Sequence, residues 1–359
     1  MIIISRYLIR EVSKPILIFF LALTFIFAAY SASEFLGKAA QGLIRIDTIA
    51  ILVFLKSVIA MEVVLPIATF LTVVVVLSRL GATYEITAMA FCGYSRLRVH
   101  KALAIIFVVM AIIVGFLSTW ARPRVYAETY RILQNAKLDI NLNDVQEGVF
   151  LAPDDGKTVI FLEPQGDANP RKNKRDVFVF LERSDGKLVM RADRIQQVND
   201  AETGAIEFVF KDLEIWSLDG GADSMTVATD EMSIPFDSGT NTSERKRRKA
   251  TTTSELFHRT NPEDMAEFQW RLVRPFSTLV LGFLAVALSS FVPRRDRFTR
   301  LLLAVVVYII YFNLQALAKT WVEQGIVPAI PGLFWVDGLI ALVLLFLFVR
   351  SRIQQSRPA

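Results

Sequence analysis

The chain has 359 residues, of which 53% are hydrophobic and 21% are charged. Its mean hydropathy of +0.43 is too high for a soluble domain of this length, so the charges must be separated from long apolar stretches. The single cysteine, Cys92, excludes a disulfide framework and a cysteine-rich metal site. The net charge of +5 is small, and many of its cations flank apolar stretches, so it does not indicate nucleic-acid binding.

Six apolar stretches are long enough to cross a membrane, because a spanning helix needs about 20 mainly apolar residues. The first is too long for a cleavable signal peptide and lacks a small-residue cleavage site. The sequence therefore predicts an α-helical transmembrane protein with spans 1–3 in residues 1–120 and spans 4–6 in residues 272–359. The six stretches are residues 15–33, 58–77, 102–120, 273–292, 301–318 and 333–349.

Lysine and arginine are distributed unevenly over the short segments that flank these spans. One side of the membrane holds fourteen of them and the other side holds four. Because the cytoplasmic side carries the excess of cations, both termini are predicted to be cytoplasmic. The long segment 121–271 then lies on the outer side of the membrane.

The cytoplasmic segment 79–93, between the second and third spans, is predicted to form a helix of about three turns that ends at Gly93. Tyr84, Ala88, Phe91 and Cys92 share one face of this helix, with Glu85 beside it. Two interpretations remain open. The helix either lies in the membrane interface or docks into a groove of a cytoplasmic partner, where Glu85 would face a basic residue.

The outer segment changes character over residues 145–238, where short β-branched and aromatic runs alternate with Asp-Gly turns. The clearest hairpin turn is Ser184–Lys187. Strands at spacings near ten residues predict an all-β domain, either a β-sandwich or a jelly roll. Residues 239–255 are rich in serine, threonine and charge and are predicted to be a flexible linker. We considered contact with anionic lipid head groups as an alternative for this segment.

Polar residues within the spans are costly and therefore mark candidate sites. Glu62 and Asp337 are explained equally well by snorkelling or by pairing with nearby residues. Asn313 and Gln315 form either interhelical hydrogen bonds or part of a substrate cavity. A set of cations at the predicted outer ends of the spans could hold a phosphate group. The set consists of Lys38, Arg271, Arg274 and Lys319. No nucleotide-binding loop or nucleophile–base pair is recognisable, which argues against enzymatic activity in this chain.

Several motifs in both membrane halves resemble those of the LptF/LptG family of lipopolysaccharide export permeases, and of its LptF members in particular. The matching motifs are Arg6–Glu11, Leu36-Gly37 with Gly42, Glu62 with Leu65-Pro66, Glu85–Met89 with Cys92-Gly93, Trp270-Arg271, and Pro293-Arg294 with Arg297. The family also shares the predicted layout of three spans, an outer β domain and three spans.

The resemblance implies a permease subunit in the inner membrane of a Gram-negative bacterium. Its implied partners are an LptG-like permease, a cytoplasmic LptB-like ATPase dimer that binds the ATP, and a membrane-anchored LptC-like protein. Together they would extract lipopolysaccharide and pass it to a periplasmic β-jelly-roll bridge. The chain itself would need no cofactor.

The resemblance also implies roles for individual residues. It assigns ATPase coupling to Tyr84, Glu85, Ala88, Met89 and Phe91. The candidate lipopolysaccharide cavity contains Tyr30, Lys38, Arg271, Asn313, Gln315 and Lys319. The sequence departs from the family in having no basic residue within Tyr30–Glu34, and Lys38 is the candidate to replace that charge. Two alternatives remain, an ABC permease for lipoproteins and a non-transporting scaffold that tethers envelope proteins.

Overall fold

The structure is a computed structural model of the chain, and it falls into two compact units that are described separately below. The first unit comprises residues 1–33, 50–129 and 248–359, and the second comprises residues 34–49 and 130–247. The structure describes residues 2–40, 44–138, 150–151, 158–162, 177–183, 186–199, 206–217, 226–235, 240–291 and 297–355.

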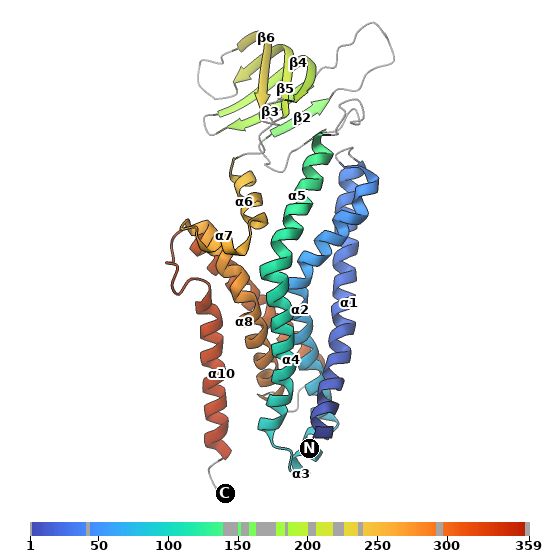
Figure 1. The fold of residues 1–359 in the computed structure, drawn as a ribbon, viewed down its shortest axis with the longest axis vertical. Helices are drawn as coiled ribbons and strands as arrows, with labels where there is room; N and C mark the ends of the chain where they lie inside the picture. Colours follow the sequence, from blue (N-terminus) through green and yellow to red (C-terminus); the bar gives the residue numbers. More distant parts are fainter. Residues whose placement is uncertain are drawn as a thin grey trace. The chain divides into compact units, whose positions relative to one another are not determined.

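Long apolar helices dominate the first unit (Figure 1). Among the described residues, five helical segments are long and apolar enough to cross a membrane, and α10 carries a shorter apolar run over Phe334–Phe346. A multi-pass membrane protein is therefore supported, whereas the sixth predicted span is not confirmed. The long helices are α1 (Ile2–Ala40), α2 (Ile49–Ala82), α4 (Arg96–Phe116), α8 (Pro262–Phe291), α9 (Arg297–Glu323) and α10 (Phe334–Gln355).

The core of this unit lies between α4 and α8, with α2, α9 and one end of α1 packed around them. The two helices approach closely at Gly282 of α8, where a Cβ atom would lie 2.6 Å from Cγ of Phe107. The ring of Phe107 also meets Phe283 edge-on, with 5.4 Å between the ring centroids. Small residues at helix crossings are typical of membrane bundles because they let the helices pack closely.

The helix that contains the third predicted span continues past residue 120, the predicted start of the outer domain. Figure 1 shows α4 continuing through the π-helical turn η2 (Leu117–Ala121) into α5 (Arg122–Leu138). The polar residues beyond 120 are therefore the continuation of one long helix. Hydropathy missed this because it detects the apolar run and not the helix that extends past it.

The second unit contains one antiparallel sheet of six described strands in sequential order, so each strand pairs with its neighbours in the chain. The predicted hairpin is confirmed, since Arg183 pairs with Gly186 across it. The predicted jelly roll is not confirmed, because the described strands form a meander. The strands are β1 (Phe150–Leu151), β2 (Thr158–Leu162), β3 (Val177–Arg183), β4 (Gly186–Asn199), β5 (Ile206–Ser217) and β6 (Thr226–Pro235).

The sheet buries alternate residues of its central strands. In β4, Met190 and Ala192 are buried whereas Arg191 is exposed, which is the two-residue period of a strand with one covered face. In β5, Phe210 and Leu213 are both buried although they are three residues apart. Asp212 between them has a positive φ of 52°, a conformation that aspartate tolerates better than most residues.

The segment predicted as a flexible linker contains two helices, α6 (Thr240–Ala250) and α7 (Thr253–Phe257). Leu256 of α7 is fully buried. The charged run that suggested a linker lies in α6, whose half-exposed side chains include Lys246, Arg248 and Lys249. Two short segments complete the helices, η1 (Ile46–Thr48) and α3 (Glu85–Phe91).

Candidate functional site

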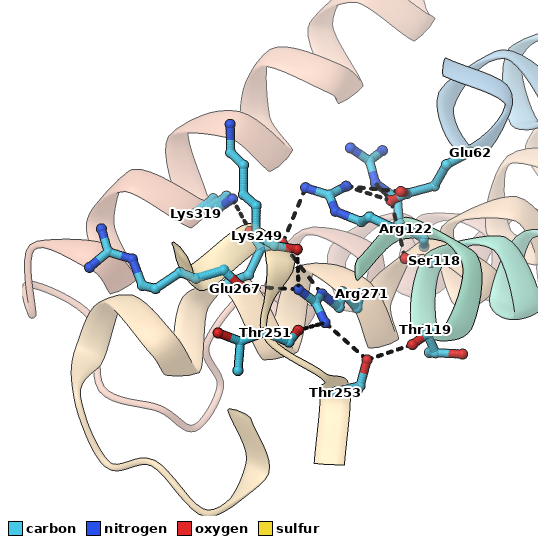
Figure 2. A network of polar contacts seen from close by, with 12 residues as sticks. Glu62, Ser118, Thr119, Arg122, Lys249, Thr251, Thr253, Glu267, Arg271 and Lys319 are labelled. Carbon is cyan, nitrogen blue, oxygen red and sulfur yellow. Dashed lines mark hydrogen bonds and ion pairs between the residues drawn. The ribbon is translucent and has the colours of Figure 1, made fainter. Parts of the chain in front are cut away.

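Glu62 lies inside α2 and is buried, with 1% of its surface exposed. Its carboxylate accepts two hydrogen bonds from Nη1 of Arg122, at 2.9 and 3.1 Å, and one from Oγ of Ser118 at 3.1 Å (Figure 2). Nε of Arg274 lies 3.4 Å from the same carboxylate. Of the two explanations that the sequence left open for Glu62, the structure supports pairing with other residues.

A second buried carboxylate, that of Glu267 on α8, extends this ion network. Nη2 of Arg122 lies 3.2 Å from its Oε1, so Arg122 bridges the two carboxylates. Nζ of Lys319 donates to its Oε2 at 2.8 Å, and Nε of Arg271 donates to its Oε1 at 3.4 Å. Within the described chain, two buried carboxylates thus face four cationic side chains from α5, α8 and α9.

Arg271 is fully buried and satisfies its remaining donors at the end of α6. Its Nη1 donates to the carbonyl oxygen of Thr251 at 2.9 Å and to Oγ1 of Thr253 at 3.0 Å. Its Nη2 donates to the carbonyl oxygens of Lys249 and Arg248, at 3.1 and 3.3 Å. A cation at these terminal carbonyls also matches the negative end of the helix dipole. Arg271 therefore fixes the chain between α6 and α7 to the membrane helix α8 (Figure 2).

Local helix geometry brings these side chains together. Glu267 and Arg271 are four residues apart on α8 and so lie on the same face. The π-helical turn η2 places Ser118 and Arg122 toward Glu62 (Figure 2). Arg122 and Glu267 were not among the site residues predicted from the sequence. The spacing of Glu267 and Arg271 was a signal that could have identified this pair.

Three of the four cations predicted to bind a phosphate pair with buried carboxylates instead. Arg271, Arg274 and Lys319 pair with the buried carboxylates of Glu62 and Glu267. Arg274 also stacks on Trp270, with its Cζ 3.7 Å from the ring centroid. The four expected cations are thus not one free cluster.

Lys38 belongs to the second unit, where it pairs with Glu34 four residues earlier at 3.1 Å. The remaining cavity candidates lie apart from the ion network. Tyr30 is 68% exposed on α1, and Asn313 is exposed and donates to a carbonyl of its own helix, that of Ile309, at 2.8 Å.

Gln315 is buried beside a second polar group that joins α8, α9 and α10. Its Nε2 lies 3.2 Å from Oη of Tyr311, which donates to Asp337 at 2.6 Å. Ser277 of α8 also donates to Asp337, at 3.2 Å. For Asp337 the structure therefore supports pairing with residues of the neighbouring helices, whereas Gln315 donates to Tyr311 of its own helix.

Residues 79–93, predicted to form one cytoplasmic helix, form a shorter helix than expected. α2 continues to Ala82, Tyr84 has a positive φ of 59°, and α3 has only seven residues. The prediction of one three-turn helix is wrong because the chain turns sharply at Tyr84. Gly93, with a φ of 77°, ends the segment as predicted.

The faces of α3 differ in exposure. Tyr84 and Phe91 are 75% and 89% exposed, and Ala88 is exposed as well. Met89, grouped with them at the sequence level, is half-buried and packs against the core together with Ile86. The exposed face of α3 therefore carries aromatic and small side chains, which are available for contact.

These features define a class, namely a multi-pass membrane protein with an antiparallel β unit between two groups of apolar helices. The sequence profile of the family described as lipopolysaccharide export system permease LptF/LptG matches residues 6–350. The chain therefore belongs to the LptF/LptG family, which supplies the permease component of a transport system.

The chain is 26% identical to the lipopolysaccharide export system permease protein LptF of Escherichia coli K12. The match covers 95% of this chain and 93% of the relative. The proteins with the same description from Escherichia coli O157:H7 and Shigella flexneri match with the same identity and coverage.

Proposed function

We propose that this chain is the permease subunit of an ABC-type complex that extracts lipopolysaccharide from the inner membrane and passes it to a periplasmic β-jelly-roll bridge. Membership of the LptF/LptG family supports this directly. The structural observation that carries the proposal is α3, a short helix between two spans that exposes Tyr84 and Phe91. Such a helix gives an ATPase a contact on the permease.

The proposed complex contains an LptG-like permease, an LptB-like ATPase dimer and an LptC-like membrane-anchored protein. The ATPase dimer binds and hydrolyses the ATP, and this chain binds no cofactor. The cationic flanks of the spans support cytoplasmic termini and a periplasmic β unit, in the inner membrane of a Gram-negative bacterium.

Of the five candidate spans among the described residues, those of α1 and α9 are the least covered by the rest of the chain. Only 11% of the apolar window of α1 and 28% of that of α9 is buried, against 56% for α2. Each buried CH₂ group of an acyl chain contributes about 0.8 kcal/mol, so a multi-chain lipid needs a continuous apolar path out of the bilayer. We propose that α1 and α9, with their counterparts in the second permease, line that path.

Accessibility divides the candidate lipid contacts. Tyr30, Asn313 and Lys38 are exposed or partly exposed and can reach a ligand, so we assign the direct contacts to them. Lys319 is partly exposed but its Nζ pairs with Glu267, so we place it at the border of the cavity. Arg271 and Gln315 are buried, so they would shape the cavity indirectly by holding α6, α8 and α9 in place. For ATPase coupling, Tyr84, Ala88 and Phe91 provide the contact surface, Met89 packs beneath it, and Glu85 lies at its edge.

Native mass spectrometry of the chain purified in mild detergent tests this proposal. We expect one particle that contains an ATPase dimer, a second permease and bound lipopolysaccharide. Glu85→Arg should release the ATPase, whereas the matched charge reversal Glu255→Arg, at an exposed residue of α7, should retain it. A chain isolated alone, or with periplasmic proteins and no ATPase, would instead identify a scaffold. Bound lipoprotein in place of lipopolysaccharide would identify the other alternative.

A further inference from the structure

The first turns of α1 are tied to the residues on both sides of α3. Oη of Tyr7 donates to Oε2 of Glu85 at 2.8 Å. Oγ of Ser5 and Oη of Tyr94 are hydrogen-bonded at 2.8 Å, and Arg79 at the end of α2 forms an ion pair with Glu11. The start of α1 therefore contacts the chain before, within and after α3.

Two hydrogen bonds hold the carboxylate of Glu85 in place at the start of α3. The carboxylate of Glu85 accepts one bond from Tyr7 and another from Oγ1 of Thr83, at 3.0 Å. Tyr84 between Thr83 and Glu85 is held in the left-handed region, which is unfavourable for a residue other than glycine. Strained backbone of this kind persists where the surrounding contacts fix it, and it is frequent in switch regions.

The middle of α1 is packed only weakly. Leu8, Val12 and Ile16 are buried near its start and Ser31 and Phe35 near its end, but no residue from Leu17 to Tyr30 is buried. A helix that is unpacked along its middle can bend there without disrupting the core. The buried residues at its start lie at the end that contacts α3.

We propose that Tyr7 is a positioning residue that couples α3 to α1 through Glu85, so that an ATPase acting on α3 moves the span that lines the lipid path. The inference rests on the proposed function and adds the route by which the movement reaches the cavity. Glu85 then acts within the chain, between Thr83 and Tyr7, in addition to any contact with the ATPase.

Tyr7→Phe in the assembled complex tests this coupling, because it removes only the hydroxyl group. We expect the ATPase to remain bound and the amount of lipopolysaccharide released per ATP to fall about fivefold, the factor that corresponds to one hydrogen bond of about 1 kcal/mol. Ser13→Ala removes a hydroxyl from the same helix two turns later and should leave release unchanged. If Tyr7 acts through Glu85, the double variant Tyr7→Phe/Glu85→Gln should release no less than Glu85→Gln alone.

A distance measurement provides a readout that a merely structural role would not change. Leu21 on α1 and Ile112 on α4 are exposed and can carry spin labels after replacement by cysteine in a Cys92→Ala background. Nucleotide should change the distance between these labels in the otherwise unaltered complex, and Tyr7→Phe should reduce the fraction of molecules that change.

The outcomes separate this inference from the proposed function. A complex that shows no ATP-dependent lipid release overturns the proposed function. If the complex releases lipid but nucleotide does not change the distance between the labels, the coupling route alone is overturned. Unchanged release and an unchanged distance response in Tyr7→Phe also overturn the coupling route.

Discussion

Neutralising Glu62 should destabilise the membrane unit strongly, because this carboxylate faces two guanidinium groups in a buried site. Glu62→Gln keeps the shape of the side chain but removes the charge that faces Arg122 at 2.9 Å and Arg274 at 3.4 Å. Removing one partner of a buried ion pair costs about 3–5 kcal/mol. We expect a loss near the lower end, about 3 kcal/mol, because glutamine keeps one acceptor oxygen and Arg122 keeps Glu267.

The free energy of unfolding in mixed micelles, measured by titration with a denaturing detergent, gives this loss directly. Glu255→Gln is the matched control, since Glu255 pairs with Arg259 at an exposed i,i+4 site and such pairs contribute about 0.3–0.5 kcal/mol. The double variant Glu62→Gln/Arg122→Gln should lose less than the sum of the two single losses, because it removes both members of the pair. Equal losses for Glu62→Gln and Glu255→Gln would contradict the account of the ion network.

Three further variants or labels test the packing, the α6 attachment and the α3 surface. Gly282→Ala should lower the free energy of unfolding by about 1–3 kcal/mol, because its Cβ would overlap the ring of Phe107, whereas Gly338→Ala, which has open space, should be neutral or gain up to about 1 kcal/mol. Arg271→Lys cannot reproduce the forked contact with the carbonyl oxygens at the end of α6. Hydrogen exchange over residues 251–257 should therefore become faster, because the free energy of local opening falls by about 1.5–3 kcal/mol. Cys92 is exposed, so maleimide should label it readily in the isolated chain and several-fold more slowly when the ATPase is bound; equal rates would place the ATPase elsewhere.

The apolar spans were the most predictable part of the fold. Hydropathy locates helices such as α2 and α9 because the bilayer requires about 20 apolar residues in each. It does not detect their polar continuations, so it ended the third span near residue 120 although the helix continues to Leu138. The β hairpin at Ser184–Lys187 was predictable because its Asp-Gly turn is a local signal. The order of the strands was not, because short strands of this kind can form a jelly roll as well as the sequential meander of the described strands.

The ion network was predicted only in part, because its contacts join residues far apart in the chain. Glu62 pairs with Arg122, which is sixty positions later in the chain, and Lys319 of α9 pairs with Glu267 of α8. The sequence pointed to the cations and suggested a phosphate as their partner. The carboxylates that pair with them became visible only when the helices were packed together. The turn at Tyr84 was missed for a different reason, since a positive φ at a tyrosine has no sequence signal.

ATP-driven release of lipopolysaccharide tests the central claim most directly. The complex would be reconstituted in lipid nanodiscs loaded with lipopolysaccharide, and transfer to a soluble jelly-roll acceptor would be measured with and without ATP. The account predicts transfer that requires ATP and is lost in Glu85→Arg but kept in Glu255→Arg. Transfer that is independent of ATP, or that persists in Glu85→Arg, would contradict it.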